Sequence, residues 1–114
     1  MRRFVNTGKG KMKMSKLEKI KKVAKFTDDA DSEVRAAAFE ALGEFPGDEY
    51  ALEICQNTIR DNDPAVRLAV AKALKKIGND HVVEALRHQM LHETDEALKK
   101  AFEDAMDACR ERRF

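Results

Sequence analysis

Residues 61–78 read DNDPAVRLAVAKALKKIG, and residues 29–45 read DADSEVRAAAFEALGEF, which is nearly the same text 32 positions earlier. A fainter copy, ETDEALKKAFEDAMDAC, follows at residues 93–109. Similarity at a fixed period is the sequence signature of a repeat architecture. The aligned apolar positions are Val34, Val66 and Leu98; Ala37, Ala69 and Ala101; Ala41, Ala73 and Ala105; Leu42, Leu74 and Met106; and Phe45, Ile77 and Cys109.

Each copy predicts one amphipathic helix. Its apolar residues recur at spacings of three and four, which places them on one stripe of a helix. An aspartate stands before each pattern, where a carboxylate accepts hydrogen bonds from free backbone N–H groups, and Pro64 follows at the first helical position of the middle copy. The stripe of the middle copy is Val66, Ala69, Val70, Ala73, Leu74 and Ile77, and the aspartates are Asp31, Asp63 and Asp95.

A second amphipathic pattern fills the segments between these helices. Together the two patterns predict three helical hairpins, at approximately residues 15–45, 48–77 and 80–110. A Pro-Gly pair and a Gly-Asn pair break the chain between hairpins. The apolar positions of this second pattern are Leu17, Ile20, Val23, Ala24 and Phe26; Ala51, Ile54, Cys55, Thr58 and Ile59; and Val83, Leu86, Met90 and Leu91.

The repeats predict how the chain folds as a whole. A single hairpin cannot bury its apolar stripe, but hairpins stacked side by side form a continuous core, for which about three copies are the practical minimum. We therefore expect an all-α fold, an α-solenoid of three helical hairpins with about six helices, wound as a right-handed superhelix. Residues 15–114 would form this single domain, and residues 1–14 a basic, flexible N-terminal arm.

The repeated motif D-x-x-V-R followed by A-x-x-A-L-G resembles the short HEAT repeats of the phycobilisome-lyase type. It stands in DSEVRAAAFEALG and DPAVRLAVAKALKKIG, and the resemblance covers roughly residues 15–110. The third copy departs from the motif, because Leu98 and Lys99 replace Val-Arg and the glycine is lost, as suits a polar closing helix. The resemblance implies the HEAT fold, and functions that include scaffolds, chromophore lyases, oxygenase-like iron proteins and DNA-repair modules.

One basic residue in each copy stands one step off the apolar stripe. These residues are Arg35, Arg67 and Lys99, each four positions after a capping aspartate. The resemblance implies that such arginines bond to turn carboxylates of their own or the adjacent repeat. Anion binding by the column is the alternative.

A partner-binding patch is predicted on the face of the second helices opposite the stripe, which lines the concave surface of a HEAT stack. We expect it to dock a peptide or helix of unknown identity. The alternative is that Phe39 leans sideways into the core between repeats. The apolar residues of the predicted patch are Ala36, Phe39, Leu68 and Ala71, and the basic residues around it are Arg35, Arg67, Lys72 and Lys75.

A second function class follows from the charge distribution. Residues 1–25 hold ten Lys or Arg and one Glu, while the remaining 89 residues hold twelve bases and twenty acids. A basic arm can bind nucleic acid, an anionic membrane or an acidic partner, and nucleic-acid binding is the first alternative to the scaffold. A merely solvated terminus is the other reading. The arm residues assigned to nucleic acid are Arg2, Arg3, Lys9, Lys11, Lys13 and Lys16.

Metal and cofactor chemistry are not predicted. Glu84, His88 and His92 recur every fourth residue on one helical face, a spacing that can hold Zn²⁺ or Fe²⁺, but the periodicity places that face outward. His92-Glu93 is similar to the His-Glu pairs of HEAT-type deoxyhypusine hydroxylases, yet it occurs once and in a turn. We expect exposed side chains, no metal and no cofactor.

The remaining features favour a non-enzymatic protein. Ser15 and Ser32 are the only serines, neither lies in a nucleophile elbow, and no phosphate-binding glycine loop is present. Cys55 and Cys109 are expected to be buried free thiols.

Because no apolar run approaches the roughly 20 residues of a membrane span, we expect a cytoplasmic protein without membrane contact. An oligomer and a chromophore-lyase-like accessory role remain open.

Overall fold

The computed structural model describes residues 14–113, which form six α-helices and two short 3-10 helices and contain no strand. The prediction of an all-α fold with about six helices is confirmed. The helices are α1 (Lys16–Ala24), α2 (Ser32–Leu42), α3 (Glu49–Asn57), α4 (Pro64–Ile77), α5 (Val83–His92) and α6 (Glu96–Arg110), and the 3-10 helices span Lys25–Asp28 and Asp80–Val82.

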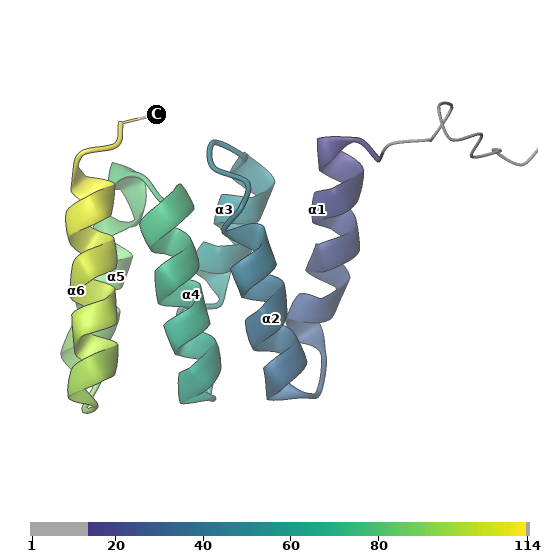
Figure 1. Ribbon diagram of the computed structural model, residues 1–114. Coiled ribbons are helices and arrows are strands. Elements are labelled where there is room, and N and C mark those ends of the chain that lie inside the picture. The colour runs from purple at the N-terminus through teal and green to yellow at the C-terminus, as the bar shows by residue number, and fades with distance from the viewer. Residues whose placement is uncertain (1–13, 114) are drawn as a thin grey trace, which may run out of the picture.

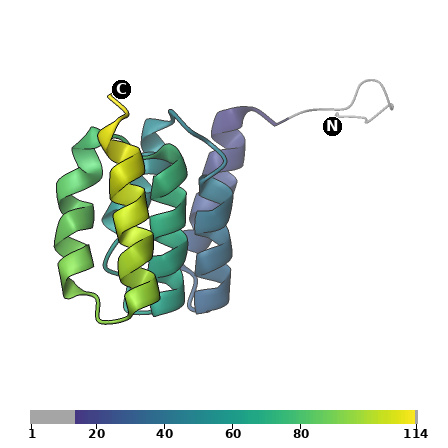
Figure 2. The same cartoon turned by 60° about the vertical axis from the view of Figure 1, so that its left-hand side comes forward.

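The helices are arranged as successive pairs. Figure 1 shows the second helices α2, α4 and α6 side by side in one row, with α3 and α5 behind them, and Figure 2 shows the same row from another side. The described chain is elongated, with extents of 55 × 33 × 19 Å. This is the translational succession of hairpins that the 32-residue period predicts.

Side-chain caps fix where the second helices begin. Asp31 accepts from the backbone N–H of Glu33 at 2.8 Å, and Asp63 accepts from that of Ala65 at 2.8 Å. Asp95 caps α6 in the same way, and Pro64 opens α4 at a position where no N–H is needed. The aspartates predicted to start helices therefore do so in all three repeats.

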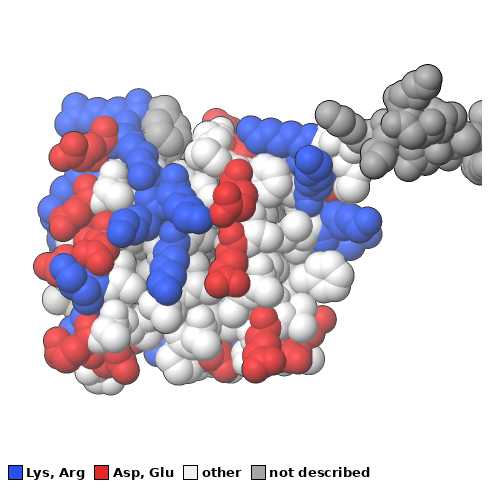
Figure 3. All heavy atoms as spheres, in the orientation of Figure 1, with Lys and Arg blue, Asp and Glu red and all other residues white. Residues whose placement is uncertain are grey.

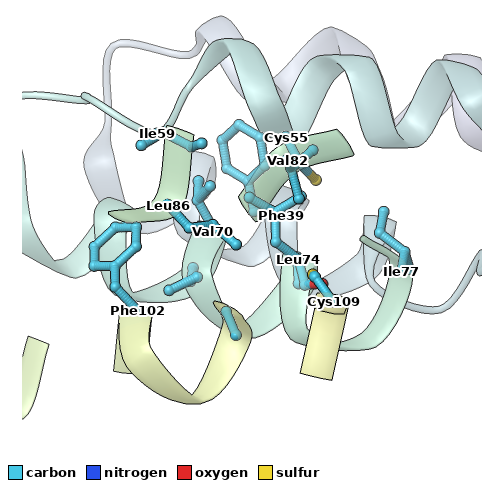
Figure 4. Close-up of a cluster of buried hydrophobic side chains, with 14 of the residues drawn as sticks. Phe39, Cys55, Ile59, Val70, Leu74, Ile77, Val82, Leu86, Phe102 and Cys109 are labelled. Carbon is cyan, nitrogen blue, oxygen red and sulfur yellow. The ribbon is translucent and has the colours of Figure 1, made fainter. Parts of the chain in front are cut away.

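The core lies between the two layers and is centred on α4. Every residue of the predicted stripe of α4 is buried, and Ala71 is buried as well. Figure 4 shows Val70 and Leu74 of α4 among side chains from several hairpins, including Phe39 of α2 and Phe102 of α6. Burial of such side chains contributes about 1.5–3 kcal/mol each relative to exposure, so α4 is the best-anchored helix.

Among the helices of the described residues, none combines the length and the apolar character that a bilayer crossing requires.

Candidate partner-binding face

A ladder of ion pairs runs along the turns between the two helices of each hairpin. Arg35 Nε lies 3.1 Å from Asp61 Oδ2, and its Nη2 lies 3.1 Å from Oδ1 of the same carboxylate. Arg67 repeats this fork one hairpin later, with Nε 2.7 Å from Glu93 Oε2 and Nη2 3.2 Å from Oε1. Each arginine also donates from Nη1 to a backbone carbonyl of its own turn, Asp29 at 2.9 Å and Asp61 at 2.8 Å. Such bidentate, charge-assisted contacts fix both distance and orientation.

This ladder settles the role of the arginine column. Arg35 and Arg67 hold one hairpin to the next, as the family resemblance implies, and the hydrogen bond to Asp61 raises the pKa of Arg35. Within residues 14–113, Lys99 pairs with Glu96 of its own helix alone, at 3.9 Å. The acidic partners Asp61 and Glu93 were missed in the sequence, although they lie 32 positions apart and so share the period of the bases. Arg35 and Arg67 are therefore structural, and their place at the rim of the predicted patch is corrected.

The predicted apolar patch does not form as expected. Phe39 and Ala71 are fully buried, whereas Ala36 and Leu68 are partly buried. Positions 39 and 71 are equivalent, and each lies on the side of a second helix that packs toward the next repeat. Glu103, the equivalent residue of the last repeat, is exposed because no further repeat follows it in the described chain. The alternative reading of Phe39, a side chain in the core between repeats, is confirmed.

The exposed face of the second helices carries charged side chains, which form one acidic column along α2 and one basic column along α4. Figure 3 shows basic side chains gathered over the central helix α4 and acidic ones over α2 beside it. Lys76 Nζ contacts Glu44 Oε2 across the two columns at 2.9 Å. Lys72 and Lys75 are exposed and take part in no ion pair within residues 14–113. The exposed residues of the columns are Glu33 and Glu40 on α2 with Glu44 just after it, and Lys72, Lys75 and Lys76 on α4.

On the corresponding face of α6, Lys100 forms ion pairs with acidic side chains of the same helix. Lys100 Nζ lies 3.1 Å from Asp104 Oδ1 and 3.8 Å from Glu103 Oε1. The hydrogen bond to Asp104, together with the negative charges of Asp104 and Glu103, raises the pKa of Lys100. The last helix thus presents a polar, internally paired surface, as expected of a closing helix.

Of the residues assigned to nucleic acid, Lys16 is exposed on α1. The others lie outside the described residues, so binding of nucleic acid stays a prediction.

Glu84, His88 and His92 are exposed, as expected. Glu84 pairs with Arg87, and His92 Nδ1 lies 2.8 Å from the carbonyl of His88. Residues 14–113 contain no cluster of three His, Cys, Asp or Glu side chains suited to a metal.

Both cysteines are buried free thiols, as predicted. Burial raises the pKa of Cys55 to about 12 and that of Cys109 to about 11. The Cys109 thiol donates to the backbone carbonyl of Leu74 at 3.2 Å. Raised pKa values keep both groups in the unreactive thiol form near neutral pH, so they act as core side chains.

Comparison with known proteins supports the fold assignment. No curated protein and no solved structure matches the chain. The family model described as HEAT repeats matches residues 20–107, which is most of the chain; it does not confirm the phycobilisome-lyase subtype. HEAT repeats generally act as protein-interaction scaffolds and are generally non-enzymatic. Three stacked helical pairs, ion pairs that recur with the 32-residue period and this match show that the chain belongs to the HEAT repeat family.

Proposed function

We propose that this protein is a non-enzymatic scaffold that binds a segment of a protein partner across the exposed face of its second helices. The observation that carries the proposal is the pair of oppositely charged columns on α2 and α4. Neighbouring columns of opposite sign select a partner with the complementary order of charges, because electrostatic complementarity supplies specificity and association rate. The cytoplasmic location and the absence of catalysis belong to the same proposal.

Two features make this face suited to recognition. The ladder and the core fix the spacing of α2 and α4, so the charged side chains stand on a rigid base. Lys72 and Lys75 have no carboxylate partner in the described chain and are available to an acidic residue of another protein. One turn before Lys72 on α4, the partly buried Leu68 offers a small apolar contact.

Site-specific photo-crosslinking tests the proposal. A photoreactive amino acid is placed at Leu68, on the proposed face, or at Gln56, which is exposed on α3 in the other layer. We expect a discrete crosslinked partner from position 68 only. The charge reversal Lys72→Glu with Lys75→Glu should remove that product while the helical circular dichroism spectrum is unchanged. Equal capture from both positions, or capture that survives the reversal, would show that this face is not the binding surface.

A further inference from the structure

The two ends of the helical stack differ in how they meet solvent. At the C-terminal end, the position of α6 that corresponds to the buried Phe39 and Ala71 is the exposed Glu103, and Asp107 one turn later is exposed as well. Lys100 pairs with acids of its own helix there. Polar outer faces of this kind close a repeat array. The C-terminal end of the described stack therefore presents a charged surface to solvent.

The N-terminal end lacks such a closing surface. In α4, the apolar residues that face the preceding second helix are buried, and a Cβ at Gly43, the C-cap of α2, would lie 3.3 Å from Ala73 Cα. The equivalent positions of α2 are more open, because no second helix precedes it within residues 14–113. Val34, Ala41 and Phe45 are only partly buried and Ala37 is exposed, whereas Val66, Ala73 and Ile77 are buried and Ala69 is 6% exposed.

A groove lies between α1 and α2 at this end. It has a volume of about 370 Å³ and an almost entirely apolar surface. Its floor includes Val23, Ala41 and Phe45, and Met14 at its edge is 39% exposed. The groove is small, and its apolar lining joins the partly buried Val23 of α1 to Ala41 and Phe45. The residues that line it are Met14, Lys19, Lys22, Val23, Ala41, Glu44 and Phe45.

The charges around the groove are predominantly basic. Lys19 and Lys22 line it, and the carboxylate of Glu44 on the opposite wall is already paired with Lys76. Residues 16–25 carry five lysines and one glutamate. This charge disfavours two occupants. One is residues 1–13, which hold five Lys or Arg and no acid, and the other is a second copy that meets this edge with its own N-terminal end and so brings an equally basic α1 to it.

We propose that this groove receives an acidic amphipathic helix of a protein partner, seated where a preceding second helix of the stack would lie. Inside the molecule α4 receives α2 through the same positions, so a helix is the element that this surface accommodates. The small side chains Ala37 and Ala41 allow the backbone of such a helix to approach closely. Lys19 and Lys22 pair with its acidic residues. The inference rests on the proposed function only in that the ligand is a protein.

A titration with a synthetic helix tests the inference. The probe is a 15-residue peptide with leucines at spacings of three and four and glutamates elsewhere, added to the full chain labelled with ¹⁵N. We expect amide shifts concentrated at Val23, Ala41 and Phe45. A second peptide with lysine in place of glutamate should bind about tenfold more weakly, because two exposed ion pairs become repulsive contacts.

Matched variants locate the binding site. Lys19→Glu with Lys22→Glu changes only exposed groups and should weaken the acidic peptide about tenfold. Lys72→Glu with Lys75→Glu, the variant that tests the proposed face on α4, should leave this titration unchanged. Ala41→Glu should abolish the localised shifts, whereas Ala65→Glu, at an exposed alanine of α4, should not.

Four results would overturn the inference. Equal affinity for the two peptides would show that charge does not select the ligand. Amide shifts spread over the whole chain would show that the peptide does not bind at the groove. If sedimentation shows a dimer that Ala41→Glu dissociates, the occupant is a second copy. If deletion of residues 1–13 shifts the amide resonances of Ala41 and Phe45, the occupant is that segment. Loss of groove binding with intact crosslinking at Leu68 leaves the proposed function standing.

Discussion

Gly78 shows how a single residue is constrained by its neighbours rather than by its backbone. Its φ of −75° and ψ of 168° are accessible to any residue. A Cβ at this position would lie 2.5 Å from Cys109 Sγ and 2.6 Å from the carbonyl oxygen of Leu74. The glycine that ends α4 is therefore required by close packing against the last helix. Gly47 is the contrasting case, since it has a φ of +85° and open space around it.

We predict that Gly78→Ala lowers the free energy of unfolding by about 1–3 kcal/mol through overpacking. Adding Cys109→Ala should not restore stability, because the clash with the Leu74 carbonyl remains after the thiol is removed. Urea unfolding followed by circular dichroism measures both variants. An unchanged midpoint for Gly78→Ala would contradict the packing argument.

The elements are joined by a charged ladder and an apolar core that do different things. The core supplies non-directional stabilisation, whereas the arginine forks fix which turn meets which helix. Arg67 and its partner Glu93 are largely shielded, with side-chain exposures of 19% and 3%, and Gln89 also donates to Glu93 at 2.8 Å. Removal of the arginine would leave a buried carboxylate with one neutral donor.

We predict that Arg67→Ala destabilises the fold by about 3–5 kcal/mol, the typical cost of breaking one side of a buried ion pair. Lys99→Ala is the matched control at the equivalent position of the last repeat, where the ion pair found among the described residues is a 3.9 Å contact within one helix. Its expected cost is below about 0.5 kcal/mol. Chemical denaturation of the two variants side by side measures the difference. Equal midpoints would mean that the ladder carries no net stability.

The whole molecule is a linear stack, so its stability is expected to vary along its length. Helix α4 has neighbours on both sides and buries seven residues, whereas α1 buries only Ile20. In such an array each repeat is stabilised by its immediate neighbours, and the ends open first. The open N-terminal groove lies at the less stable end.

We predict that backbone amides of α1 exchange with deuterium about a hundredfold faster than those of α4, because α1 opens without unfolding the rest. Hydrogen exchange measured by mass spectrometry or NMR resolves the two helices. Uniform protection across α1 and α4 would show that the chain unfolds as one unit. Binding of an acidic helix at the groove should slow exchange in α1 selectively.

The repeat, the helix starts and the apolar stripe of α4 could all be predicted from the amino-acid sequence. A period of 32 residues, an aspartate before each second helix and the 3.6-residue spacing of apolar side chains are local properties, and each was found where it was predicted. The role of the arginines followed from the family resemblance.

Which sides of each helix are buried depends on contacts between repeats that are distant in the sequence. A helix in a solenoid packs against its own partner and against the repeats before and after it, so one helical periodicity cannot separate its several contact sides. Phe39 and Ala71 were therefore placed on the open face, although the next repeat covers them. The pairing of Arg67 with Glu93 and the groove beside Ala41 likewise depend on how neighbouring hairpins meet, since their atoms come from segments far apart in the chain.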